Sequence, residues 1–138
     1  MMERLPALVA ALWWGSLTTL GFFVVPMLFA ALPTPAMAGG VAARLFSAQT
    51  WVSVGCGMLL LLFSQSKRPD VLVERSSLAM IFIVLGMLLA LLVEFGVAPR
   101  IALRDNLRLW HGVGTGMYLA QWLCAGATLW QLLCKPPT

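Results

Sequence analysis

The chain has 138 residues, of which 61% are hydrophobic and 10% are charged, and its formal net charge is +4. A soluble domain usually carries about a quarter of its residues as charged side chains, and a chain this short has too little interior to bury so much apolar surface. The composition therefore excludes an ordinary soluble fold. The basic residues are spread over the ends of the apolar segments, which is typical of membrane-flanking anchors and not of a nucleic-acid binder.

Four apolar segments follow one another along the chain, separated by short stretches that contain most of the charges. A helix needs roughly 20 apolar residues to cross the hydrocarbon core of a bilayer. We therefore predict transmembrane helices at Pro6–Leu32, Val41–Ser64, Ser77–Pro99 and Leu109–Cys134. The predicted fold is an all-α integral membrane protein, an antiparallel bundle of four transmembrane helices that forms one domain over residues 1–138.

The first helix is expected to be retained, because its apolar run of about 27 residues is much longer than the roughly 7–15 residues of a signal-peptide core. Pro26 within it and Pro99 at the end of the third helix each remove a backbone donor and are expected to kink their helices. Small residues at four-residue spacing allow close helix contact in lipid. They form two lines: Ala7, Ala11, Gly15 and Thr19 on the first helix; Gly112, Gly116, Ala120, Cys124 and Thr128 on the fourth.

Four crossings place both termini on one side of the membrane together with the loop Gln65–Ser76. Loops rich in Lys and Arg tend to stay in the cytoplasm. The terminal side carries Arg4, Lys67, Arg68, Arg75 and Lys135, and the opposite side carries Arg44, Arg100, Arg104 and Arg108. This small excess predicts that both termini are cytoplasmic.

Glu94 and His111 are ionisable residues that lie inside these apolar segments, near the same end of the third and fourth helices. An ionisable side chain at membrane depth costs on the order of 3 kcal/mol unless it is paired, hydrated or used. Consecutive antiparallel helices bring the two residues to the same end of the bundle, where the second helix also begins. We predict a ligand-binding site there, formed by Arg44, Gln49, Glu94, Arg100, Arg104, Arg108, His111 and Thr115.

Two interpretations of this site remain open from sequence. Glu94 is either a proton relay, a cation ligand or a counter-ion, or one half of a buried pair with Arg or His that holds the hairpins together. The fourth helix carries His111, Thr115, Tyr118 and Trp122 at helical spacing. That stripe either lines a cavity or packs in a helix–helix interface where its polar atoms find partners.

Catalytic and metal-binding motifs are absent. The sequence has no Gly-x-Ser-x-Gly, no P-loop and no Cys-x-x-Cys, and its methionines and cysteines follow no ligand spacing. With one histidine, we predict no resident metal, no cofactor and no enzymatic activity.

Several short runs resemble the transmembrane protein 205-like family of small four-helix bacterial membrane proteins. The runs Leu12–Gly15, Gly21–Phe29 and Ala38–Gly40, with Arg44–Phe46, are similar to the start of that family, and Arg108–Gly112 is similar to the motif that opens its last helix. The resemblance implies a four-helix fold in a bacterial inner (cytoplasmic) membrane. It also implies a distant similarity to copper-resistance membrane proteins of the D type, although one histidine cannot supply a bis-histidine haem or a His-rich copper site.

Three functions follow as expectations. The first is a non-enzymatic membrane protein that binds or moves a small ion or anionic ligand at the predicted site, with a role in transport or metal tolerance. The second is a structural subunit that joins a homodimer or a larger membrane complex through its small-residue faces, with the lipid bilayer as its other partner and no nucleic acid. The third is a metal- or haem-binding redox protein.

Overall fold

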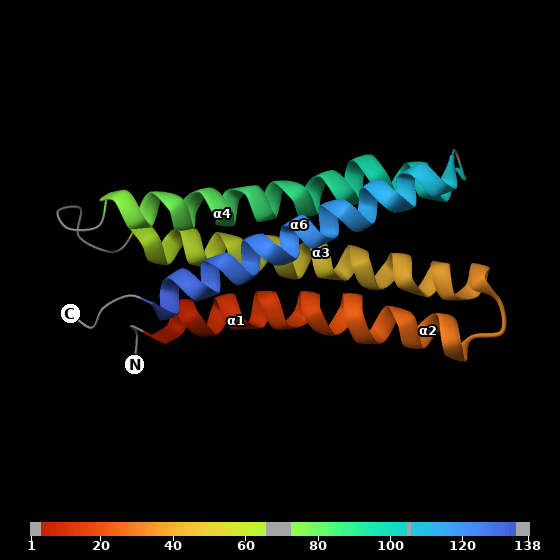
Figure 1. The fold of residues 1–138 in the computed structure, drawn as a ribbon, viewed down its shortest axis with the longest axis horizontal. Coiled ribbons are helices and arrows are strands. Elements are labelled where there is room, and N and C mark those ends of the chain that lie inside the picture. The colour runs from red at the N-terminus through yellow and green to blue at the C-terminus, as the bar shows by residue number, and fades with distance from the viewer. Residues whose placement is uncertain (1–3, 66–72, 105, 135–138) are drawn as a thin grey trace.

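The computed structural model describes residues 4–65, 73–104 and 106–134, and its regular structure is helical throughout that part of the chain. The helices form four rods (Figure 1). The first rod consists of α1 (Leu5–Thr18), the π-helical turn η2 (Thr19–Val24) and α2 (Val25–Ala31). The second is α3 (Pro35–Gln65); the third combines α4 (Val73–Leu92), the π-helical turn η3 (Val93–Val97) and α5 (Ala98–Ala102); the fourth is α6 (Leu107–Leu133).

The four rods pack together as an antiparallel bundle, which confirms the predicted fold class. Helix α6 packs against α1 and α4, and α3 packs against the same two helices from the other side (Figure 1). The start of α1 and the end of α6 therefore lie at one end of the bundle. The opposite end, here called the α2/α5 end, contains α2, α5, the start of α3 and the start of α6.

Three of the rods are long and apolar enough to cross a membrane, judged by length and composition over the described residues. They span Leu5–Ala31, Pro35–Gln65 and Leu78–Ala102. Helix α6 is also long, at 27 residues, but it carries polar side chains such as Gln121 and Thr128 at buried positions. Helix α6 packs alongside α1 and α4 but is not among the three candidate spans, so its crossing of the membrane stays a prediction. Lys67, Arg68 and Lys135, which enter the orientation prediction, lie outside the described residues.

The second rod begins earlier than the sequence suggested, at Pro35 and not at Val41. Proline suits the first turn of a helix because its missing N–H has no partner there. The hydroxyl of Thr34 accepts a hydrogen bond from the backbone N–H of Met37 at 3.3 Å and so satisfies one of the first free donors. The connection between the first two rods is therefore a tight turn at residues 32–34.

A π-helical turn comes shortly before each of the two prolines in the interior of a rod. Pro26 comes two residues after η2, and Pro99 comes two residues after η3. A proline ring clashes with the carbonyl four residues before it in a regular helix, and the wider π-helical turn relieves such a clash. The third rod consequently continues past Pro99 to Ala102, whereas the sequence predicted that it ends at the proline.

The core lies between α1, α3, α4 and α6 around Trp13 and Leu17, which are fully buried. Close helix contact depends on glycine at Gly86, where a Cβ would lie 2.7 Å from Cη2 of Trp13. Many large apolar side chains outside this core are exposed, for example Trp130 at 70% and Leu103 at 79%. Such surfaces suit lipid and not water.

Candidate ligand-binding site

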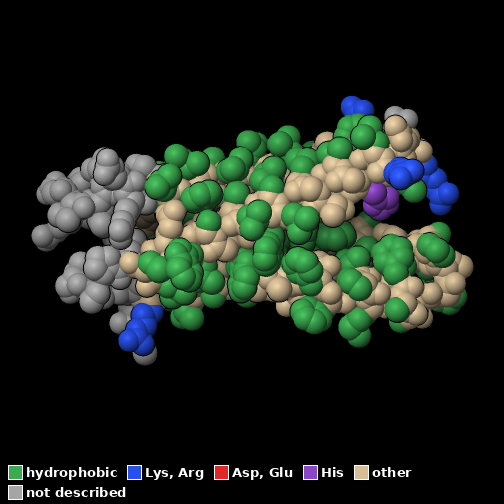
Figure 2. Space-filling view, in the orientation of Figure 1, with side chains coloured by type: hydrophobic (Ala, Val, Ile, Leu, Met, Phe, Trp, Pro, Cys, Tyr) green, Lys and Arg blue, Asp and Glu red, His purple; other side chains and the backbone are tan. Residues whose placement is uncertain are grey.

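The bundle splits at the α2/α5 end. Here α2 packs against α3, whereas α5 packs against α6, and no residue of α2 or α5 is buried. Figure 2 shows an open notch between these two pairs of helices, with basic side chains and histidine gathered over its α5/α6 side. We call this opening the notch. Its walls are α2 with the start of α3 on one side, and α5 with the start of α6 on the other.

A hydrogen bond between the hairpins closes the inner end of the notch. The hydroxyl of Ser47 on α3 donates to Oε1 of Glu94 in η3 at 2.6 Å, and the pair is partly buried. This bond holds the carboxyl group of Glu94 in place between α3 and η3. One of the two interpretations from sequence gave Glu94 an Arg or His partner, and neither identified Ser47. The available signal was that Ser47 lies three residues after Arg44, on the same side of the same helix.

Tyr118 forms the second contact at the inner end of the notch. Its hydroxyl donates to the carbonyl of Leu17 at 2.6 Å and also faces the backbone N–H of Gly21. In an α-helix, that carbonyl would accept from that N–H, so the phenol is inserted into the hydrogen-bond ladder of the first rod. The ring also packs edge-on against Phe46 of α3, with centroids 5.4 Å apart. Tyr118 thus joins three rods. It lies beside η2, so the inserted hydroxyl and the π-helical turn occur at the same place in the first rod.

The stripe on α6 divides into two halves. Trp122 Nε1 donates to Thr18 Oγ1 at 2.8 Å, and Tyr118 donates to the first rod as described, so these two residues belong to a helix–helix interface. His111 and Thr115 are exposed. His111 precedes Tyr118 by seven residues, or about two helical turns, so it lies on the same side of α6 but about 10 Å further out, along the notch. The helix–helix interface interpretation therefore holds for Tyr118 and Trp122, whereas the cavity-lining role of His111 and Thr115 stays a prediction.

The predicted arginines are all exposed at this end of the bundle: Arg44 on α3, Arg100 on α5, Arg104 in the turn that follows, and Arg108 on α6. The guanidinium of Arg100 stacks over the ring of Trp110, 4.6 Å from its centroid. This cation–π contact fixes Arg100 against α6.

Gln49 is placed elsewhere. It is buried, and its Nε2 donates to Ser16 Oγ at 2.9 Å, in the interface between α1 and α3. One turn further along α3, Ser53 accepts a hydrogen bond from Gln121 Nε2, also at 2.9 Å. These bonds form a polar layer in the middle of the bundle, separate from the notch. Buried amides of this kind stabilise helix packing in lipid through their hydrogen bonds.

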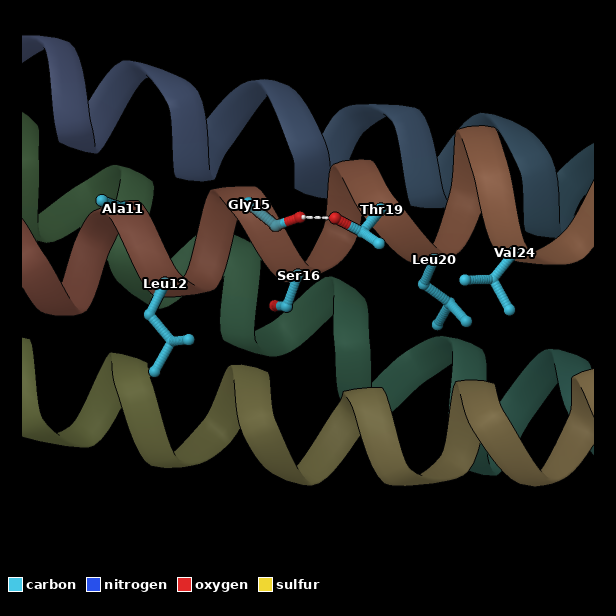
Figure 3. Close-up of a pocket in the computed structure, with 7 residues that line it drawn as sticks. All are labelled: Ala11, Leu12, Gly15, Ser16, Thr19, Leu20 and Val24. Carbon is cyan, nitrogen blue, oxygen red and sulfur yellow. Dashed lines mark hydrogen bonds between the residues drawn. The ribbon is translucent and has the colours of Figure 1, made fainter.

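A shallow groove runs along the first rod, with a volume of about 500 Å³. It is lined by Ala11, Leu12, Gly15, Ser16, Thr19, Leu20 and Val24, and Figure 3 shows Thr19 Oγ1 bonded to the carbonyl of Gly15 along it. A Cβ at Gly15 would meet no atom within 4 Å. Three members of the small-residue line of the first helix, Ala11, Gly15 and Thr19, therefore line an open groove on the bundle surface.

Metal-binding groups do not cluster. Among residues 4–65, 73–104 and 106–134, no three His, Cys, Asp or Glu side chains are placed to hold a metal ion together. Cys56 and Cys124 are buried as free thiols, and Cys134 is exposed at the end of α6.

The small-residue line of the fourth helix is partly buried and partly exposed. Cys124 and Thr128 are buried in the bundle, whereas a Cβ at Gly112 would meet no atom within 4 Å.

The rods and their lipid-compatible surfaces define a multi-pass α-helical membrane protein with a split, arginine-rich end. Residues 8–108 match a domain of unknown function, DUF4149, and because this range covers more than half of the chain, the protein belongs to that family. No curated protein and no solved structure matches the chain. The matched range includes the runs in Leu12–Phe46 that carry the family resemblance and ends as α6 begins. Similarity to the transmembrane protein 205-like family and to copper-resistance proteins stays a prediction.

Proposed function

We propose that this protein is a non-enzymatic membrane protein that binds a small anionic ligand in the notch at the α2/α5 end. The observation that supports this most directly is the notch itself, with basic side chains and the histidine gathered over its α5/α6 side in Figure 2. Arg44 and Arg108 are exposed at the same end of the bundle. Guanidinium groups offer donors in a fork geometry that fits carboxylates and phosphates. Arg100 and Arg104 add positive charge on the same side.

Glu94 sets the inner limit of the proposed site. Its carboxylate is held by Ser47 between α3 and η3, so it repels an anion that moves deeper and keeps it near the arginines. The carboxylate retains further acceptor positions for a hydroxyl or N–H donor of the ligand. In this proposal Glu94 both joins the hairpins through Ser47 and faces the ligand.

The proposal also places the site on one side of the membrane. With both termini in the cytoplasm of a bacterial inner membrane, the notch opens away from the cytoplasm. Helix rods of this length reach the headgroup layer, so the arginines are accessible from water and from lipid.

The test is to identify the anions that co-purify with the protein. Wild type, Arg108→Gln, His111→Ala and Arg4→Gln are purified in the same mild detergent, extracted, and compared by mass spectrometry for anionic small molecules and lipids. Arg4 is an exposed arginine at the opposite end of the bundle and serves as the control. We expect an anionic species in stoichiometric amount with wild type and Arg4→Gln, and at several-fold lower occupancy with the other two. Equal anion content in all four proteins would contradict the proposal.

A second candidate function is self-association through the groove of the first rod. The supporting observation is that Ala11, Gly15 and Thr19 leave an open groove where another helix can approach closely. In this proposal, the occupant is the first rod of a second copy. Gly15→Ile should convert a dimer into a monomer in mild detergent, as measured by light scattering. A wild-type protein that is already monomeric at high concentration would rule this candidate out.

A further inference from the structure

We infer that the anion bound in the notch is the phosphate of a membrane phospholipid, whose headgroup lies among the arginines and whose chains lie along α2. This inference rests on the proposed anion site and names its ligand class. The observation behind it is that the helices around the notch differ in chemistry: α2 is apolar throughout, whereas α5 and the start of α6 are basic and polar.

Helix α2, which forms part of the first wall, is apolar on every side. All residues of α2 (Val25–Ala31) are apolar and none is buried, with Met27 exposed to 67% and Phe29 to 48%. Whichever face α2 turns toward the notch, that face has no hydrogen-bonding side chain. A soluble anion would gain nothing from α2, whereas an acyl chain would be accommodated by it.

The second wall provides the positive charge. Arg108 and His111 lie three residues apart on α6, on neighbouring parts of one face, and Thr115 adds a hydroxyl one turn further in. Arg44 is exposed on α3, about one turn outward from Ser47. The proposed phosphate takes donors from Arg44 on one hairpin and from Arg108 on the other, because bidentate pairing with guanidinium is the favoured geometry for a phosphate.

The depth of the notch agrees with a lipid headgroup. The first rod has 27 residues, so it is about 40 Å long, compared with about 30 Å for the hydrocarbon core and 40–45 Å for the bilayer with its headgroups. The ends of the rods therefore lie at headgroup level. From Tyr118 to the start of α6 the notch extends about 16 Å along the helix, which is enough for the phosphate and the upper part of the chains.

Charge also favours an anionic lipid over a neutral one. Among the residues that the structure describes at this end, which leave out Asp105, Glu94 is the acidic side chain and four arginines are exposed. The ammonium of a zwitterionic headgroup projects outward from its phosphate, toward the arginines and away from Glu94, so it would be repelled. Phosphatidylglycerol has the same phosphate without that cation.

The experiment measures lipid retention by native mass spectrometry. The full chain in mild detergent is titrated with phosphatidylglycerol, with phosphatidylcholine and with glycerol 3-phosphate, which has the headgroup phosphate without the chains. Four proteins are compared: wild type, Arg44→Gln/Arg108→Gln, Arg44→Lys/Arg108→Lys and Arg4→Gln. All these side chains are exposed, so the substitutions leave the core intact. The lysine variant retains the charge and checks that any loss is not a folding defect.

We expect wild type and Arg4→Gln to retain phosphatidylglycerol at least tenfold more tightly than phosphatidylcholine. The double glutamine variant should lose this preference, and the double lysine variant, which keeps the charge without the bidentate geometry, should keep part of it. If glycerol 3-phosphate binds with the same dependence on arginine while phosphatidylglycerol is retained no better than phosphatidylcholine, the lipid assignment is wrong and the anion site stands. If no probe depends on Arg44 and Arg108, both proposals are overturned.

Discussion

Replacing Gly86 with alanine tests the packing of the bundle core. A Cβ at this position would lie 2.7 Å from Cη2 and 2.8 Å from Cζ2 of Trp13, with Cys124 Cβ at 3.5 Å behind it. Carbon atoms in good contact lie about 3.5–4.0 Å apart, so the indole would have to move by about an ångström. Trp13 is fully buried and has no space to turn into. The bundle must therefore shift to accept one methyl group.

The magnitude follows from two opposing effects. Alanine is favoured over glycine in a helix by about 1 kcal/mol, while an extra methyl in a tightly packed core costs about 1–3 kcal/mol. The control is Gly55→Ala, because Gly55 is an exposed helical glycine whose Cβ would meet no atom within 4 Å. The propensity term is shared by both variants, so Gly86→Ala should be about 1–3 kcal/mol less stable than Gly55→Ala.

The assay is reversible unfolding in mixed micelles with increasing sodium dodecyl sulfate, followed by far-UV circular dichroism. Adding Trp13→Phe should recover much of the loss, because phenylalanine lacks the atoms that clash. Trp13 is suited to a double-mutant cycle with Gly86, because its Nε1 has no hydrogen-bond partner among the described residues, so the substitution breaks no hydrogen bond. Equal stability of Gly86→Ala and Gly55→Ala, or no coupling in the double variant, would refute this account of the core.

Three further predictions concern the polar contacts and the topology. Tyr118→Phe removes the hydroxyl inserted beside η2 and should lower the free energy of unfolding by about 1 kcal/mol in the same assay. If the variant is as stable as wild type, the bond to Leu17 is not formed in the membrane. Ser53→Ala leaves the buried amide of Gln121 without its partner and should cost about 1–2 kcal/mol, whereas the double variant Ser53→Ala/Gln121→Leu should be closer to wild type. Cys134 should react with a membrane-impermeant maleimide in inverted vesicles and not in intact cells, while the two buried thiols stay unlabelled; labelling in intact cells would reverse the predicted orientation.

The candidate site was only partly predictable. The sequence located Glu94, the arginines and His111 at one end of the bundle, because an ionisable residue stands out in an apolar segment. It did not identify Ser47, since a serine is unremarkable within a predicted span, and it placed Gln49 with Glu94 although Gln49 bonds to Ser16. Both outcomes depend on how each helix is rotated about its axis.

The sequence by itself determined the class of protein, the number of rods and the end at which the charges gather, because the bilayer imposes a length and a polarity on each segment. Helix rotation could not be read from it. In lipid, the buried and the exposed faces are both apolar, as Leu17 in the core and Leu103 on the surface illustrate, so the one-sided pattern of a soluble helix is missing. Only the tertiary structure decided which polar atoms meet: Ser47 with Glu94, and the phenol of Tyr118 with the backbone of the first rod. It likewise decided that the hairpins separate beyond these contacts and leave the notch open.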